Sequence, residues 1–342
     1  MTPGVQTDPA TWQRLIESLR ADAPVSKGEG LGSLSSGLQR PECVLTHSSG
    51  HVFVSDLRGG VSKIQPNGAT SLIGGQTLSD SVRLLPNGFA MRRDGSFLVA
   101  NLGEQGGVWC IEPGGAASPW LTEVDGRTVH RVNFVVNDQQ GRVWVCISAT
   151  DGSDAYPLRN ATGYIVLCDA VGIRVVADGL HYTNECRVSA DGRFLYVNET
   201  FGRRLSRFRI GPHGELTAKE TLATFCDGDF PDGLALDSEG GAWVVCVGSN
   251  RLYRIAPDGT KLTVIDDSVT ATTQALDAAF VAGTLNRPQL SSARGHRLHN
   301  VTSIAFGGAD LRTAYMGCLA GDTLATFRSP VAGVRPVHWS WP

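Results

Sequence analysis

A short pattern of polar and apolar positions recurs six times along the chain. In its clearest copy, Asp232 stands just before the apolar run 234–236, a turn glycine follows at Gly240, and an aromatic and β-branched run returns at 242–245. The polar residue and the turn glycine are eight residues apart in five copies, at Glu42 and Gly50, Asn87 and Gly95, Asn133 and Gly141, Asn184 and Gly192, and Asp232 and Gly240. In the sixth copy Ser303 takes the polar position and Asp310 lies in the turn. Each copy therefore predicts a hairpin of two short strands.

A second glycine turn follows five of these hairpins, at 66–68, 113–115, 170–172, 212–214 and 257–259. Two hairpins per copy make a four-stranded antiparallel sheet, and copies that begin about every 45 to 50 residues have the period of propeller blades. The pattern predicts an all-β protein, a six-bladed β-propeller with four-stranded antiparallel blades. Chance repetition of a common glycine turn is the alternative, and six copies in one register argue against it.

The N-terminal part of the chain has a different pattern. Residues 9–21 place Trp12, Leu15, Ile16 and Leu19 on one face of a short amphipathic helix. We expect residues 1–30 to form a helical extension that packs on the propeller rather than binding a partner, and residues 31–342 to form one propeller domain. A strand from the Gly- and Ser-rich stretch 22–38 would pair with the last blade and close the ring, which removes exposed sheet edges.

Two long segments interrupt the blade pattern. One is the insertion 148–163 in blade 3, and the other is the link 267–300 between blades 5 and 6, which contains a helical pattern at 271–284. If the polar residues open the innermost strands, strand direction puts both segments at the polar end of the ring. Long loops on a rigid scaffold are typical of lids or binding walls. A structural insertion or a dimer contact is the alternative.

Composition narrows the class of protein. Of 342 residues, 18% are charged and 42% are apolar, and the formal net charge is −3. These values differ from those of disordered chains, and no basic cluster points to nucleic acid or a membrane surface. No secretory leader pattern or long apolar run is present, so we expect a cytoplasmic protein, monomer or homodimer, that acts on a small molecule. Eight cysteines are scattered singly, which favours buried free thiols over disulfides.

The innermost strands of a propeller converge near one axis. The six polar residues at which these strands begin should therefore lie close together. They are Glu42, Asn87, Asn133, Asn184, Asp232 and Ser303, and all offer oxygen donors. Hard cations such as Ca²⁺ and Mg²⁺ prefer such ligands, and two carboxylates would balance a divalent charge. Asn or Asp before Gly is also an ordinary turn signal, and the pairs 87–88 and 232–233 alone fit that alternative.

Several motifs resemble the senescence-marker-protein, gluconolactonase and luciferin-regenerating-enzyme-like family of six-bladed propellers. They are Pro41-Glu42, Arg131-Val132-Asn133, Asn184 with Ser189 to Val197, Pro231 to Ala235, and Thr302 to Gly308. The resemblance implies that Glu42, Asn133, Asn184 and Asp232 hold one divalent cation, calcium first, with zinc, manganese or magnesium as alternatives. It also implies that Arg131 contacts substrate, that Asp232 is the catalytic base, and that the reaction is lactone hydrolysis. Relatives that hydrolyse organophosphates are also known.

Two positions depart from that family. Glu185 follows the third ligand where the family often has glycine, and Phe134 follows the second where it often has aspartate. Strand alternation predicts that Glu185 points away from the channel. The segment 196–205 also resembles strictosidine-synthase-like propellers, which include non-hydrolytic members.

We take a metal-dependent lactonase as the leading hypothesis. Its candidate substrate contacts are Arg131, Asn133, Asn87, Glu185 and His299. A structural ion pair is the alternative role for Arg131, and packing is the alternative for His299. A metal- or ligand-binding propeller without turnover, or a non-hydrolytic enzyme, is the competing hypothesis for the whole protein.

Overall fold

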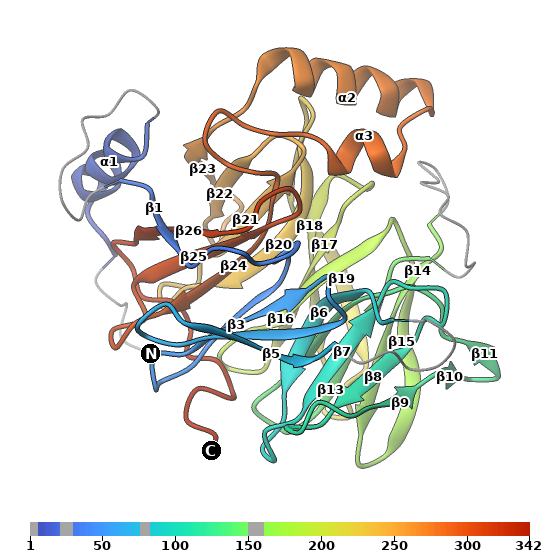
Figure 1. The fold of residues 1–342 in the computed structure, drawn as a ribbon. Coiled ribbons are helices and arrows are strands. Elements are labelled where there is room, and N and C mark those ends of the chain that lie inside the picture. Colours follow the sequence, from blue (N-terminus) through green and yellow to red (C-terminus); the bar gives the residue numbers. More distant parts are fainter. Residues whose placement is uncertain (1–5, 21–29, 76–82, 150–160) are drawn as a thin grey trace.

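Six four-stranded antiparallel sheets make up most of the described residues, and they are arranged in a ring as blades (Figure 1). The computed structural model describes residues 6–20, 30–75, 83–149 and 161–342. The prediction of an all-β, six-bladed propeller is confirmed. The insertion predicted at 148–163 lies largely outside the described residues.

In blades 1 to 3, the strands follow one another outwards from the channel. Blade 1 contains β2 (Val44–Thr46), β3 (Val52–Asp56), β4 (Gly60–Ile64) and β5 (Thr70–Gly74). Blade 2 contains β6 (Pro86–Met91), β7 (Phe97–Asn101), β8 (Val108–Ile111) and β9 (Ala117–Leu121), and a small hairpin of β10 (Glu123–Val124) and β11 (Arg127–Thr128) follows it. Blade 3 contains β12 (Val132–Asn137), β13 (Val143–Ile147), β14 (Gly163–Asp169) and β15 (Gly172–Leu180).

Blades 4 and 5 have the same order, and blade 6 takes its outer strand from the start of the chain. Blade 4 contains β16 (Thr183–Val188), β17 (Phe194–Glu199), β18 (Arg204–Ile210) and β19 (Leu216–Thr224). Blade 5 contains β20 (Phe230–Leu236), β21 (Ala242–Val247), β22 (Arg251–Ile255) and β23 (Lys261–Asp266). Blade 6 contains β24 (Val301–Gly307), β25 (Thr313–Cys318), β26 (Leu324–Arg328) and β1 (Gly32–Leu34). β1 pairs antiparallel with β26, so the predicted closure of the ring is confirmed.

The repeated turn glycines have the backbone conformation that the sequence pattern requires. Gly50, Gly95, Gly141, Gly192 and Gly240 have φ angles of 82°, 81°, 76°, 71° and 82°. This left-handed region is costly for other residues and open to glycine. The recurring glycine therefore marks the turn between the two inner strands of each of these blades.

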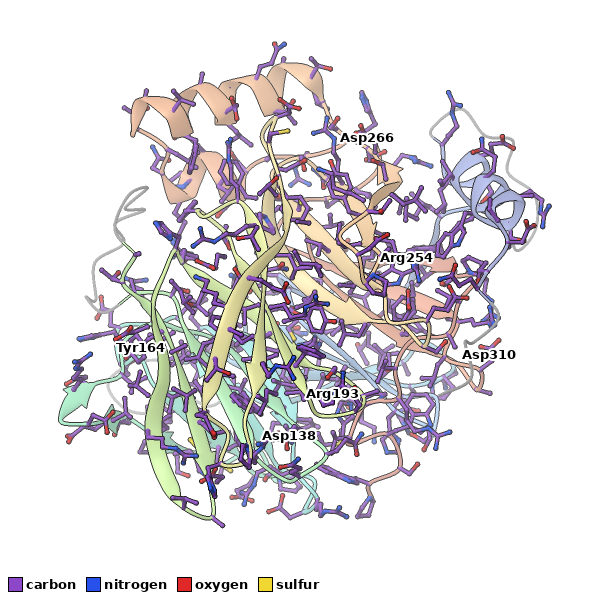
Figure 2. All side chains as sticks on the ribbon, turned by 180° about the vertical axis from the view of Figure 1, so that it is seen from behind. Asp138, Tyr164, Arg193, Arg254, Asp266 and Asp310 are labelled. Atoms are coloured by element: carbon purple, nitrogen blue, oxygen red, sulfur yellow. The ribbon has the colours of Figure 1, made fainter. Side chains whose placement is uncertain are left out.

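Two buried aspartates anchor the equivalent turns of blades 3 and 5. Asp138 Oδ2 accepts a hydrogen bond from Trp144 Nε1 at 2.9 Å, and Asp237 Oδ2 accepts one from Trp243 Nε1 at 2.9 Å. An arginine side chain also pairs with each of these aspartates. Arg254 lies 2.7 Å from Asp237, on the side of the ring that carries the N-terminal helix (Figure 2). Charge-assisted hydrogen bonds compensate for the burial of these carboxylates.

Three helices in the described part of the chain lie outside the blades. Helix α1 (Pro9–Ser18) agrees with the predicted N-terminal helix, and its Trp12 packs against Trp243 with ring centroids 5.7 Å apart. Helix α2 (Thr270–Ala282) agrees with the pattern at 271–284, and the short α3 (Arg287–Ser291) follows it at the same end of the molecule (Figure 1). No helix among the described residues is long and apolar enough to cross a membrane.

All eight cysteines are free, as predicted, and seven of them are buried. Cys226 is exposed.

Candidate metal and substrate site

The four predicted metal ligands meet at one small cavity. Glu42, Asn133, Asn184 and Asp232 all line a space of about 40 Å³ at the polar end of the channel. A buried water needs roughly 10–15 Å³ measured this way. The cavity is therefore large enough for an ion with a few waters or for one end of a small substrate.

Irregularities in the inner strands bring these residues together. The ladders shift register between Pro86 and Phe89, Val132 and Phe134, Thr183 and Cys186, Pro231 and Leu234, and Val301 and Ser303. Each shift lies beside one of the recurring polar residues. A β-bulge re-aims side chains and ends regular pairing, which is why bulges are common next to active sites.

Asn87-Gly88 and Asp232-Gly233 do not form turns. Both pairs lie inside strands, β6 and β20, and neither glycine has a positive φ. A Cβ on Gly233 would stand 2.4 Å from the Thr302 carbonyl oxygen, and one on Gly88 would stand 2.3 Å from the Phe134 ring. The turn interpretation is therefore wrong for both pairs. Glycine is needed there because neighbouring inner strands approach closely.

A hydrogen-bond chain orients the side chain of Asn184. The Thr200 hydroxyl donates to the Pro231 carbonyl oxygen at 2.8 Å and accepts from Asn184 Nδ2 at 3.0 Å. Because a hydroxyl has one proton, Thr200 can only accept from the amide. The amide nitrogen is thereby held at Thr200, and among the described residues the buried Asn184 Oδ1 has no hydrogen-bond partner.

Arg40 is the closest positive charge to Glu42. Its Nη2 lies 2.8 Å from Glu42 Oε2, although this ion pair lacks the alignment of a hydrogen bond. Burial raises the pKa of Glu42, and the guanidinium groups of Arg40 and then Arg287 oppose that rise.

Asp232 has a more strongly perturbed environment. Burial first, and then the carboxylates of Glu42 and Glu185, raise the pKa of Asp232 well above its usual value. Charged carboxylates that share a buried site repel one another, and a cation among them would relieve that repulsion.

Glu185 lies inside the channel, so the prediction from strand alternation is wrong. The bulge between Thr183 and Cys186 breaks the alternation. Burial raises the pKa of Glu185 to about 7, against the opposing charge of Arg187, whose Nη2 lies 2.9 Å from Glu185 Oε2. Glu185 is not among the residues that line the cavity, so it lies beside the site rather than on its surface.

The remaining candidate substrate contacts also lie off the cavity surface. Asn87 Nδ2 donates to Asn133 Oδ1 at 3.1 Å, and Asn87 Oδ1 accepts from Arg40, so Asn87 supports two lining residues. Arg131 Nη1 donates to the carbonyl oxygen of Leu102, which lines the cavity, at 3.3 Å. His299 is exposed and lies 2.8 Å from Arg294 Nη1.

The link between blades 5 and 6 forms one wall of the cavity. Arg287, Leu290 and Ser291 of α3 all line it. Arg203 ties the link to blade 4, because its Nη2 lies 2.7 Å from Asp277 Oδ1 in α2 and its guanidinium carbon lies 4.0 Å from the Phe280 ring centroid.

Sequence reasoning did not find three residues of this site, Arg40, Thr200 and Arg287. Arg40 directly precedes the Pro41-Glu42 motif, which is the one local signal that pointed to it. The repeat marks the inner strands, so it carries no information about Thr200 after β17 or Arg287 in the link.

The donor set fits a divalent cation. Glu42 and Asp232 supply two carboxylates, and Asn133 and Asn184 supply two amides. The buried Asn184 Oδ1 and Glu42 Oε2 atoms have no hydrogen-bond partner in the part of the chain that the structure describes. No three His, Cys, Asp or Glu side chains among the described residues cluster to hold a metal, so the amide oxygens would be needed. Oxygen-only sites of this kind suit calcium and magnesium.

The fold and the cavity define the class of protein: a six-bladed propeller with carboxylates and amides gathered at one end of its channel. Residues 40–284 match the family described as SMP-30/Gluconolactonase/LRE-like region, and the chain belongs to this family. The family resemblance seen in the sequence motifs is confirmed.

Individual relatives are more distant. The chain is 27% identical over 232 residues to 6-deoxy-6-sulfogluconolactonase of Pseudomonas putida. The aligned region covers 67% of each chain. A solved gluconolactonase from Xanthomonas campestris superposes with a TM-score of 0.65 at 17% identity over 92% of each chain. Regucalcin, a calcium-binding protein from Agrobacterium tumefaciens, superposes with a TM-score of 0.63 at 15% identity over 91% of this chain and 97% of that one. At these identities the two structures support the fold alone.

Proposed function

We propose that this protein is a divalent-metal-dependent lactonase that opens a small sugar-type or aliphatic lactone. The observation that carries the proposal is the meeting of Glu42, Asn133, Asn184 and Asp232 at one cavity in a member of this family. The lactonase name of the Pseudomonas putida relative supports the reaction class.

Glu42, Asn133, Asn184 and Asp232 would hold the cation, for which calcium is our first choice because every donor is oxygen. A cation bound there would supply Lewis-acid chemistry, which draws electron density from the lactone carbonyl.

The chain's own groups have distinct roles in hydrolysis. The oxygen of a water molecule bonds to the carbonyl carbon, the ring C–O bond breaks, and the leaving oxygen takes up a proton to give a hydroxy acid. A carboxylate oxygen of Asp232 accepts the proton from the attacking water and can return it to the leaving oxygen. Thr200 holds Asn184 in its orientation, and the apolar side chains of Leu102, Leu290 and Leu319 limit the water that reaches the cavity.

The test compares Asp232→Asn with the parent on a panel of sugar and aliphatic lactones at saturating calcium. Loss of general-base help lowers the rate by about 10²–10⁴-fold. The exposed Asp310→Asn is the matched control, since Asp310 pairs with Arg328 on the surface. Calcium-loaded Asp232→Asn that turns over like the parent would contradict the role of Asp232. Tight calcium binding with no turnover of any lactone would favour the binding-protein alternative.

A further inference from the structure

Arg40 lies beside the proposed cation site and pairs with one of its ligands. It belongs to the segment before β2, and both Arg40 and Glu42 line the cavity. Arg40 Nη2 lies 2.8 Å from Glu42 Oε2, and both side chains are mostly buried, with exposures of 17% for Arg40 and 9% for Glu42. Charges interact more strongly at such a position than on the surface, because less water screens them.

The backbone at Arg40 has a conformation that few residues with a side chain adopt. Its φ angle is 49°, in the left-handed region. The Glu42 backbone N–H donates to the Arg40 carbonyl oxygen at 2.8 Å, which closes a tight turn around Pro41. The Pro41 carbonyl oxygen in turn accepts from the backbone N–H of Cys318 in blade 6 at 2.8 Å. Strained conformations persist where the surrounding structure enforces them, and they concentrate at binding sites.

The guanidinium of Arg40 is also held between blades 1 and 2. Its Nη1 donates to the Pro86 carbonyl oxygen at 3.1 Å, and its Nη2 donates to Asn87 Oδ1 at 3.1 Å. Asn87 Nδ2 donates to the backbone and side-chain oxygens of Asn133 at 2.9 and 3.1 Å. Because Arg40 has these acceptors besides Glu42, we expect its charge to stay beside the site when a cation binds.

The charge of Arg40 acts on both carboxylates of the site. Burial raises the pKa of Glu42, burial and neighbouring carboxylates raise the pKa of Asp232, and the guanidinium of Arg40 opposes both rises. Arg287 also opposes the rise at Glu42, with a smaller effect than Arg40. A cation bound by the two carboxylates would act in the same direction, so Arg40 and the cation compensate the same negative charges.

We propose that Arg40 is a built-in counter-charge, which lowers the calcium affinity of the site and stabilises the protein while the site is empty. The inference rests on the cation site of the proposed lactonase and adds a control on how tightly that cation is held. The guanidinium and a divalent cation carry charges of the same sign, so they repel each other in a partly buried site. Removing the guanidinium relieves that repulsion and leaves the two carboxylates of the empty site less well compensated.

Calcium binding by Arg40→Gln and the parent tests the proposal. Calorimetry on chelated protein at pH 8, where protons compete least for carboxylate ligands, should show about 10- to 100-fold tighter binding by Arg40→Gln. Arg40→Gly also lacks the charge and suits the left-handed φ, so it should bind calcium as tightly as Arg40→Gln. Arg40→Lys keeps the charge and should stay near the parent. Arg14→Gln, an exposed change on α1, is the matched control.

Thermal unfolding separates a counter-charge from a purely structural residue. Without calcium, Arg40→Gln should unfold at a lower temperature than the parent. Saturating calcium should then raise its unfolding temperature more than it raises that of the parent, since tighter binding stabilises the native state more. Equal or weaker calcium binding by both Arg40→Gln and Arg40→Gly, with the same loss of unfolding temperature in the presence and absence of calcium, would overturn the proposal.

Lactone turnover distinguishes this inference from the proposed function. If the parent hydrolyses lactones and the charge-free variants do not bind calcium more tightly, the inference is wrong and the lactonase stands. If those variants bind calcium more tightly and the parent hydrolyses no lactone, the counter-charge is supported and the lactonase is contradicted. A parent that binds no calcium would overturn the inference and remove calcium from the proposed site.

Discussion

The carboxylate of Glu185 accepts a hydrogen bond from the backbone N–H of Leu234, at 3.1 Å between Oε2 and N. This contact joins blade 4 to blade 5 at the bulge that carries Asp232. The same Oε2 accepts from Arg187 Nη2 at 2.9 Å, and Arg187 also lies over the Phe134 ring of blade 3. The Glu185–Arg187 pair therefore links three neighbouring blades beside the proposed cation site.

Glu185 and Arg187 should be energetically coupled in the folded protein by about 0.5–3 kcal/mol, because the Arg187 guanidinium opposes the burial cost of the Glu185 carboxylate. Urea unfolding of Glu185→Gln, Arg187→Met and the double variant measures the coupling between the two residues. If the two single effects simply add in the double variant, the ion pair does not stabilise the inner ring.

Asn184→Ala should weaken calcium binding while the protein stays folded, because it removes one amide donor of the proposed site. Binding to the native state alone stabilises a protein by roughly 2.7 kcal/mol at a ligand concentration 100-fold above Kd. Calcium titration of chelated protein, followed by calorimetry and by thermal unfolding, checks both effects. Asn67→Ala, in an exposed turn of blade 1, is the matched control. Equal calcium affinity in Asn184→Ala and the parent would remove Asn184 from the ligand set.

The sequence predicted the ring of polar residues because their spacing repeats with the blades. An eight-residue interval between Asn133 and Gly141 is enough to place Asn133 at the start of an inner strand. It could not place Glu185, because a bulge shifts the side-chain alternation by one position and nothing in a single sequence marks the bulge. Arg287 was also beyond prediction, since its position depends on how a long link folds back over the ring. Repeated local geometry was predictable, and contacts between blades and links were not.

Breaking the ion pair between Arg203 and Asp277 should change kinetics more than stability. The pair is partly exposed, with side-chain exposures of 14% and 35%, and it fastens α2 to blade 4. Ion pairs of this kind contribute about 0.2–1 kcal/mol to the free energy of unfolding, so Asp277→Asn should leave that free energy nearly unchanged. It should raise KM about two- to five-fold, because the wall of the cavity opens more often.

Steady-state kinetics and thermal unfolding of Asp277→Asn, side by side, check that expectation. Glu220→Gln is the control, since it removes an ion pair of similar length, 2.8 Å to Arg207, on the outer strands of blade 4. Identical KM values for Asp277→Asn and Glu220→Gln would show that the link is not a functional lid.

The C-terminal segment closes the opposite end of the channel, and its buried histidine should make stability depend on pH. Val334, Pro336, Val337 and His338 line a second cavity of about 130 Å³ there. His338 Nε2 lies 3.1 Å from the Thr46 carbonyl oxygen, and burial lowers the pKa of His338 to about 4, with smaller contributions from the charges of His47 and Arg187.

Because the pKa of His338 is lower in the folded protein than the 6.5 of an unperturbed histidine, the unfolded chain binds the proton more readily. The contribution of His338 to the free energy of unfolding is therefore complete above pH 6.5 and is lost as the pH falls towards 4. The loss between pH 7 and pH 5 is about 2 kcal/mol. Urea unfolding at both pH values should show that His338→Gln loses this part of the pH dependence and keeps the rest. His213→Gln, at an exposed turn of blade 4, should behave like the parent. If His338→Gln and the parent lose the same stability between pH 7 and pH 5, His338 is not buried as a neutral side chain and the C-terminal segment does not seal the channel.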